Sequence, residues 1–173
     1  MQDNALALTE AGKKAFQDGD FNKAVNSFRK AIQHYEEGGD ILDAAETKNN
    51  LSVALLQLDK AKEAFEAAKD TDTLFAEAGD TLRQAMALGN QAAALDTLGN
   101  QEEALRLYQQ SADLFGEVGE GDYQETVLKS IAAIKLRDGK LQDTAYTMLD
   151  SLQAAQKPTL FQRIMKFLLR IVR

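Results

Sequence analysis

The sequence predicts an all-α protein, a right-handed α-solenoid of four helical hairpins followed by a C-terminal amphipathic helix. Three observations support this prediction. The 173 residues are rich in Ala, Leu, Glu, Gln, Lys and Asp, with a single Pro and no Trp, so helix propensity is favoured nearly throughout. Turn residues recur every 40 residues, and small and bulky apolar residues recur between them with the same period. A fixed period of this length is typical of helical repeat arrays.

Two sets of turn residues divide the chain into helices. The first set occupies one column of the 40-residue alignment: Gly19, Asp59, Gly99 and Gly139. The second set pairs a glycine with an acidic residue: Gly39-Asp40, Gly79-Asp80 and Gly119-Glu120. Such a glycine can end a helix in the left-handed conformation, and the acid that follows suits the start of the next helix. Each unit is therefore predicted to be helix, turn, helix, turn.

Small and large residues alternate in register between these turns. One column of small residues holds Ala24, Ala64, Ala104 and Thr144, and a second holds Gly12, Ser52, Ala92 and Ala132. Bulky residues form other columns, among them Phe28, Tyr108 and Met148, and Tyr35, Phe75 and Phe115. We expect helices to approach closely at the small columns and the bulky side chains to fill the space there.

The expected helices follow in order. They are 4–18 and 21–37 in the first unit, 41–58 and 61–78 in the second, 81–98 and 101–118 in the third, and 122–138 and 141–156 in the fourth. The units are about 1–40, 41–80, 81–120 and 121–156. No unit can bury its apolar stripe alone, but stacked units share one continuous core. We therefore expect one repeat domain over residues 1–156.

Residues 157–173 differ from the repeats and are predicted to form a basic amphipathic helix. After Lys157-Pro158 the polar residues recur at spacings of three and four: Thr159, Gln162, Arg163, Lys166, Arg170 and Arg173. The rest are large and apolar: Leu160, Phe161, Ile164, Met165, Phe167, Leu168, Leu169, Ile171 and Val172. A helix of about 22 Å is too short to span a bilayer. It can lie in an anionic membrane surface, pack against a partner or sister subunit, or fold onto its own repeats.

Charge and composition exclude several classes of function. The net charge is −7, and since the last 17 residues carry five basic residues and no acid, residues 1–156 carry −12. An acidic body repels phosphate backbones, so no nucleic-acid partner is expected. The chain has no Cys, which excludes disulfides and thiolate metal sites and fits a reducing cytoplasm. Residues 1–14 contain no recognisable secretory signal. The predicted location is cytoplasmic, with attachment to the inner face of a membrane as an added role for the tail.

Catalytic signals are absent from the sequence. His34 is the only histidine and lies on an expected second helix. Gly116, Gly119 and Gly121 are not followed by the Lys-Ser/Thr of a phosphate-binding loop. The acidic pairs fall on solvated helix surfaces or turns. We therefore expect no enzymatic activity, no cofactor and no metal site.

Two units carry a family resemblance. The first reads Leu8, Ala11-Gly12, Ala15, Ala24, Phe28 and Ala31, and the third reads Leu88, Gln91-Ala92, Leu95, Ala104, Tyr108 and Ser111. This pattern resembles the tetratricopeptide repeat (TPR) family, whose standard repeat is about 34 residues long. The period of 40 is similar to the longer variety found in kinesin light chains and spindle-orienting adaptors. The resemblance covers residues 4–156.

The resemblance implies that the first helix of each unit lines a concave groove that binds a peptide or partner protein. The candidate groove residues are Thr9, Lys13, Asn49, Asn50, Gln57, Asn90, Thr97 and Lys129. Asn50 and Asn90 lie one period apart, and an amide offers both the donor and the acceptor that an extended peptide needs. Alternatively, the two amides hydrogen-bond between repeats. The predicted function is a non-enzymatic adaptor whose C-terminal helix attaches to a membrane surface. The alternative is a structural subunit whose C-terminal helix drives homo-oligomerisation.

Overall fold

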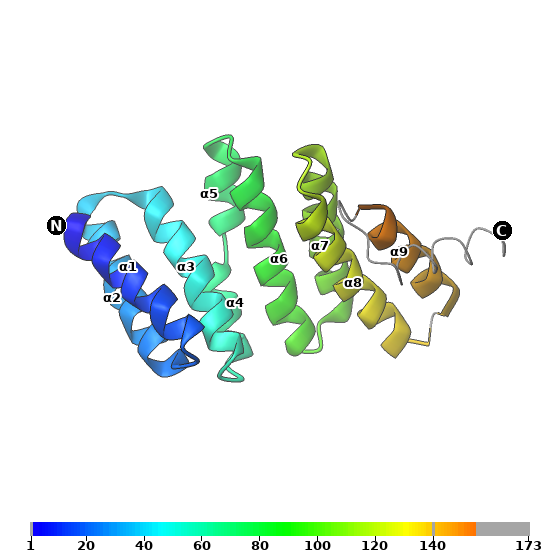
Figure 1. Ribbon diagram of the computed structural model, residues 1–173, viewed down its shortest axis with the longest axis horizontal. Helices are drawn as coiled ribbons and strands as arrows, with labels where there is room; N and C mark the ends of the chain where they lie inside the picture. The colour runs from blue at the N-terminus through cyan, green and yellow to red at the C-terminus, as the bar shows by residue number, and fades with distance from the viewer. Residues whose placement is uncertain (1, 140, 155–173) are drawn as a thin grey trace.

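The computed structural model describes residues 2–139 and 141–154, and this part contains helices and turns but no strands. The first half comprises α1 (Gln2–Gln17), α2 (Phe21–Gly38), α3 (Ile41–Leu56), α4 (Ala61–Ala68) and α5 (Thr71–Glu77). The second half comprises α6 (Thr81–Thr97), α7 (Gln101–Glu117), α8 (Gly121–Arg137) and α9 (Leu141–Ala154). Figure 1 shows four hairpins that follow one another along the long axis of the molecule. The predicted all-α array of hairpins is thus confirmed.

The turns have the predicted left-handed conformation. The φ angles of Gly19, Gly39, Gly79, Gly99, Gly119 and Gly139 lie between 71° and 82°. Glycine adopts this region without a steric penalty because it has no Cβ. Asp59 takes the same column as Gly19 with φ 58°. Acidic side chains then begin two of the helices: a carboxylate oxygen of Asp20 accepts from the Lys23 N–H at 3.0 Å, and one of Asp80 accepts from the Arg83 N–H at 2.9 Å.

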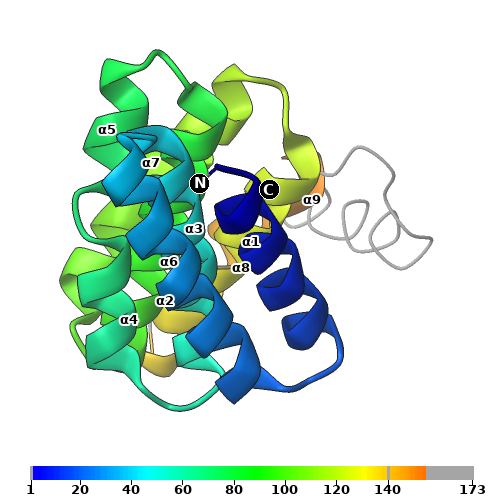
Figure 2. The same cartoon turned by 90° about the vertical axis from the view of Figure 1, so that its left-hand side faces the viewer.

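The core lies between the helices of each hairpin and between neighbouring hairpins. Ala24, Ala64 and Ala104 have no exposed surface, and the second small column is buried as well. Phe28 packs so closely on Gly12 that a Cβ there would lie 2.5 Å from the ring. Bulky residues therefore fill the small columns, as the register predicted. Viewed along the array, α1 and α2 stand in front of the units that follow (Figure 2).

The second helix of the second unit departs from the prediction. A single helix was expected over 61–78, but the chain forms α4 and α5, separated by Lys69 with ψ 136° and Asp70 with φ 62°. Buried polar side chains stabilise this break. The Ala68 carbonyl accepts from Thr71 Oγ1 at 2.7 Å and from Gln91 Nε2 at 3.0 Å. Thr71 Oγ1 also lies 3.0 Å from Asn49 Oδ1. Side chains from three helices thus satisfy polar groups that the interruption leaves without helical partners.

Two predictions concern the ends of the described part. The expected C-terminal helix lies outside the described residues, as do residues 155 and 156 of the last expected repeat helix. Across 2–139 and 141–154, no helix is both long and apolar enough to cross a membrane.

Candidate groove on the first helices

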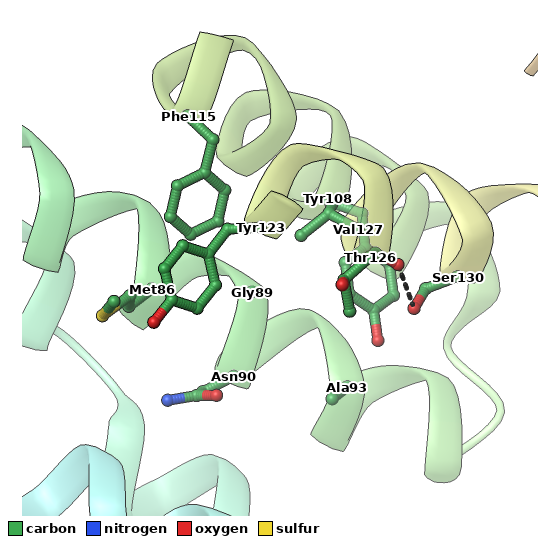
Figure 3. Close-up of a pocket in the computed structure, with 10 residues that line it drawn as sticks. All are labelled: Met86, Gly89, Asn90, Ala93, Tyr108, Phe115, Tyr123, Thr126, Val127 and Ser130. Carbon is green, nitrogen blue, oxygen red and sulfur yellow. Dashed lines mark hydrogen bonds between the residues drawn. The ribbon is translucent and has the colours of Figure 1, made fainter. Parts of the chain in front are cut away.

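A pocket of about 380 Å³ lies between α6 and α8, with α7 beneath it. Helix α6 contributes Met86, Gly89, Asn90 and Ala93, and α8 contributes Tyr123, Thr126, Val127 and Ser130. The floor comes from α7, through Tyr108 and Phe115. Figure 3 shows these side chains facing one another across the space between the two first helices. The pocket therefore belongs to the surface on which the family resemblance implied a groove.

Aromatic side chains give the pocket its shape. Tyr123 stacks on Phe115 with ring centroids 5.3 Å apart and an interplanar angle of 18°. Phe115 is buried, whereas Tyr123 is 48% exposed and stands at the rim. Gly89 allows α6 to pack closely on α7, because a Cβ at this position would lie 3.3 Å from Ser111 Oγ. The other units carry Thr9, Asn49 and Lys129 in the same column.

The polar groups of the pocket are uncharged. Ser130 Oγ donates to the Thr126 carbonyl at 3.4 Å, and the Asn90 amide makes no hydrogen bond to any described residue. Burial raises the pKa of Tyr108, and its hydrogen bond with Ser130 only partly opposes this effect. No Asp, Glu, His, Lys or Arg is found among the described residues that line the pocket. The pocket is therefore suited to bind an apolar side chain of a ligand, next to a ligand group that can hydrogen-bond with the Asn90 amide.

The preceding junction, between α3 and α6, is built differently. Arg83 and Phe75 occupy the positions of Tyr123 and Phe115, and the guanidinium carbon lies 5.0 Å from the centre of the Phe75 ring. Arg83 also pairs with Glu46 at 3.3 Å and Asp80 at 2.7 Å. The Arg83 N–H, and then the guanidinium, hold the pKa of Asp80 below its ordinary value, although partial burial opposes them. The groove therefore changes from charged to apolar between successive units.

The predicted groove residues fall into three groups. Asn90 lines the pocket, and Asn50 is half-buried with an Nδ2 that makes no hydrogen bond to the described residues. Four others reach the surface. Lys13 pairs with Glu10 at 3.1 Å and Lys129 with Glu125 at 2.5 Å, Thr97 Oγ1 donates to the Ala93 carbonyl, and Gln57 is exposed at the end of α3.

Thr9 and Asn49 require a correction. They were expected to contact a partner, yet their exposed fractions are 5% and 6%. Thr9 Oγ1 donates to the Ala5 carbonyl at 3.1 Å and lies 3.5 Å from Thr47 Oγ1, and Asn49 accepts from Thr71. Both face neighbouring helices instead of open groove: Thr9 lies against Thr47 of α3, and Asn49 lies against Thr71 of α5.

The sequence reasoning missed most of the pocket. Met86 and Tyr123 were not proposed, and Tyr108 and Phe115 were assigned only to core filling. Two signals were available: a glycine at position 89 where the other units have side chains, and an aromatic at Tyr123 where they have Asp43 and Arg83. Both mark a junction that differs from its neighbours.

The described residues offer little for metal chemistry. No group of three His, Cys, Asp or Glu side chains in 2–139 and 141–154 could hold a metal ion. His34 Nε2 lies 3.2 Å from Asn4 Nδ2, and its Nδ1 lies 3.8 Å from a Glu37 oxygen. Among the described residues, Asn4 is therefore the one hydrogen-bond partner of this histidine, and its Nδ1 is buried without one.

Comparison with known proteins gives a clear likeness in structure only. No family model and no curated protein matches the sequence. The crystal structure of the nearly identical TPR-like repeats of a candidate kinesin light chain from Podosopora anserina is 14% identical, with a TM-score of 0.78. The match covers 100% of this chain and 90% of that one. MamA is 20% identical with a TM-score of 0.66, over 87% of this chain and 78% of its own. The N-terminal domain of stress-induced protein-1 from C. elegans is 19% identical with a TM-score of 0.59, over 78% and 96%.

These likenesses establish the fold. The chain is a right-handed, all-α solenoid of the TPR-like type, and the resemblance inferred from the repeat pattern is confirmed at the level of structure.

Proposed function

We propose that this chain is an adaptor that holds a segment of a partner protein in the groove formed by α1, α3, α6 and α8, with an apolar side chain of that segment in the pocket between α6 and α8. The observation that carries the proposal is the pocket itself. It combines an uncharged lining, an exposed aromatic rim at Tyr123 and an Asn90 amide that makes no hydrogen bond to a described residue.

The size and lining of the pocket support this proposal. Its volume of about 380 Å³ lies within the range of roughly 300–1,000 Å³ that binding pockets occupy. Apolar walls gain free energy when they replace water with an apolar side chain, about 25 cal/mol per Å² buried. A half-exposed tyrosine in an aromatic stack is also a type of residue enriched at protein interfaces.

The spacing of the two asparagines supports an extended ligand. Asn50 and Asn90 occupy equivalent positions in successive units, and packed helices lie about 10 Å apart. An extended chain rises about 3.3 Å per residue, so roughly three residues separate the points at which the two amides meet it. Each amide can donate to a peptide carbonyl and accept from a peptide N–H.

The test is a peptide selection with a matched pair of variants. Peptides selected from a displayed random library are measured by fluorescence anisotropy against the wild type, Ala93→Phe and Ala76→Phe. Ala93 lines the pocket, whereas Ala76 is exposed on α5. We expect Ala93→Phe to weaken binding at least tenfold and Ala76→Phe to leave it unchanged. Equal binding by both variants would refute the pocket as the binding site.

Two roles for residues 157–173 stay predictions: attachment to an anionic membrane surface and the alternative of homo-oligomerisation. The segment lies outside the described residues. That the partner is a protein or peptide is also part of the proposal.

A further inference from the structure

A second helix inside the array has two buried faces, as α7 demonstrates. Ala104, Leu107 and Ser111 are at most 6% exposed and lie on the α6 side, where Ser111 Oγ donates to the Ala85 carbonyl at 2.7 Å. Tyr108 and Ala112 are 7% and 1% exposed. These two lie on the α8 side, since the Ala112 carbonyl accepts from Gln124 of α8 at 2.9 Å and Tyr108 lines one pocket with Val127 and Ser130 of α8.

In α9 only the first of these faces is covered. The positions one period after Ala104, Leu107 and Ser111 are Thr144, Thr147 and Ser151, which are 4%, 5% and 3% exposed. They lie towards α8, where Lys135 Nζ donates to Thr147 Oγ1 at 2.9 Å.

The second face of α9 is open. Met148 takes the position of Tyr108 and is 46% exposed, and Leu152 takes the position of Ala112 and is half-buried. In α7 the equivalent face is buried beneath α8, the next first helix. In α9 the same face carries Met148, and nearly half of the surface of this apolar side chain is exposed.

The 40-residue register identifies what would cover this face. Residues 161–173 align with residues 121–133 of α8. Four apolar residues of α8 are at most 8% exposed: Val127, Leu128, Ile131 and Ala132. One period later stand Phe167, Leu168, Ile171 and Val172, all of them apolar.

The polar residues keep the same register. Tyr123, Thr126 and Ser130 face the pocket from α8, and one period later stand Arg163, Lys166 and Arg170. Four buried and three groove-facing positions of α8 therefore correspond to apolar and basic residues of the last 15, whereas Ile164, Met165 and Leu169 stand where α8 has Gln124, Glu125 and Lys129. A helix that only needed to be amphipathic would have no reason to keep this phase relative to the preceding repeats.

The connecting length also fits. Three residues, 118–120, join α7 to α8. One period later these positions hold Pro158, Thr159 and Leu160, and Pro is well tolerated near a helix start.

We propose that residues 159–173 pack on the Met148 and Leu152 face of α9 as a fifth groove-facing helix, so that Arg163, Lys166 and Arg170 extend the groove with a basic column. The segment acts within its own chain, and its apolar side is held by α9. The groove would then end in cations that favour an acidic stretch of a bound segment.

Paired cysteines test the packing directly, because the natural chain has no Cys. The test variant joins Met148→Cys with Phe167→Cys, the equivalents of Tyr108 and Val127, which line one pocket together. The matched control joins Met148→Cys with Leu169→Cys, since Leu169 is the equivalent of Lys129, which is exposed on α8. Both full-length variants are treated at low protein concentration with a short bis-maleimide and resolved on denaturing gels.

We expect the first pair to cross-link within one chain at least tenfold faster than the control. Equal rates, or no cross-link in either variant, would overturn the proposal. A cross-linked dimer would overturn it in favour of a second copy on α9. Cross-linking of the first pair at the same rate with and without anionic vesicles, in a protein that does not float with them, would support the proposal. Flotation of wild type with those vesicles would instead assign the segment to the membrane.

Hydrogen exchange of variants without introduced thiols provides a second measurement. Phe167→Asp in the full chain should lower the amide protection of α9 several-fold and leave α1 to α3 unchanged, whereas Leu169→Asp should leave both unchanged. Equal protection of α9 in the two variants would also contradict the proposal.

Discussion

Replacement of Thr71 by Val tests how the break between α4 and α5 is stabilised. Thr71 is 1% exposed, and its hydroxyl lies 2.7 Å from the Ala68 carbonyl and 3.0 Å from Asn49 Oδ1. Valine has nearly the same shape, so the change removes the hydroxyl without leaving a cavity. The Ala68 carbonyl keeps its bond from Gln91, but Asn49 Oδ1 loses its one hydrogen bond to a described residue. An unpaired buried acceptor costs about 1–3 kcal/mol.

For a chain of this length, 1 kcal/mol corresponds to about 2–4 °C in Tm, so a cost of about 1–3 kcal/mol should lower the Tm of Thr71→Val by roughly 2 to 12 °C. The assay is thermal and urea unfolding followed by circular dichroism. Thr73→Val is the control, because Thr73 is exposed on the same helix and surface changes usually stay within about 0.5 kcal/mol.

A double-mutant cycle with Asn49→Ala sharpens the test. If Thr71 and Asn49 act through their mutual hydrogen bond, the two changes should be non-additive by about 0.5 kcal/mol or more. Additive effects, or a Thr71→Val variant as stable as Thr73→Val, would refute the assignment of Asn49 to the interior.

Three further changes have defined outcomes. Asp59→Gly should raise the free energy of unfolding by roughly 0.5–1 kcal/mol, because φ is 58° at this residue and left-handed backbone is costly for residues with a Cβ. Urea unfolding measures the gain, and Asp59→Ala should show none. Asp80 has a lowered pKa in the fold, so its carboxylate stabilises the protein above the unfolded pKa of about 3.9 and loses this effect as the pH falls through the folded value. Asp80→Asn should therefore lose less stability than wild type between pH 5 and 2, in urea midpoints measured across that range. The double change of Asn50 and Asn90 to Ala should weaken binding of a selected peptide by about 1–3 kcal/mol with a smaller change in Tm; normal binding with early melting would instead assign both amides to contacts between repeats.

Local features of the sequence predicted the fold well because the constraints behind them are local. Left-handed glycines such as Gly39 and Gly79 end helices wherever they occur. The close approach of Gly12 and Phe28 follows from a pattern of small and large residues that repeats with the period. The break at Asp70 was not predictable in this way. It depends on Asn49 and Gln91, which are distant in sequence and reach the same carbonyl and hydroxyl only after three helices have packed.

The candidate site was predicted less completely for the same reason. Asn90 was found because it occupies a column of the repeat, and it does line the pocket. Asn49 was assigned to the groove from its neighbour in sequence, yet adjacent residues on a helix point about 100° apart, and this one is buried. Tyr123 was missed because its role depends on stacking against Phe115 of another helix.

The sequence by itself determined the helical class, the 40-residue unit, the positions of the turns and the order of the hairpins. Propensity, turn conformation and the period of apolar residues are properties of short segments, and they act before any long-range contact forms. Only the tertiary structure decided that the junction between α6 and α8, one of three between successive first helices, forms this uncharged pocket. At one junction Arg83 lies over Phe75 and pairs with Glu46 and Asp80. At the next, Tyr123 stacks on Phe115, and Gly89 lines the same pocket. That difference arises where side chains of three helices meet, and it is set by their combined volume and charge in three dimensions.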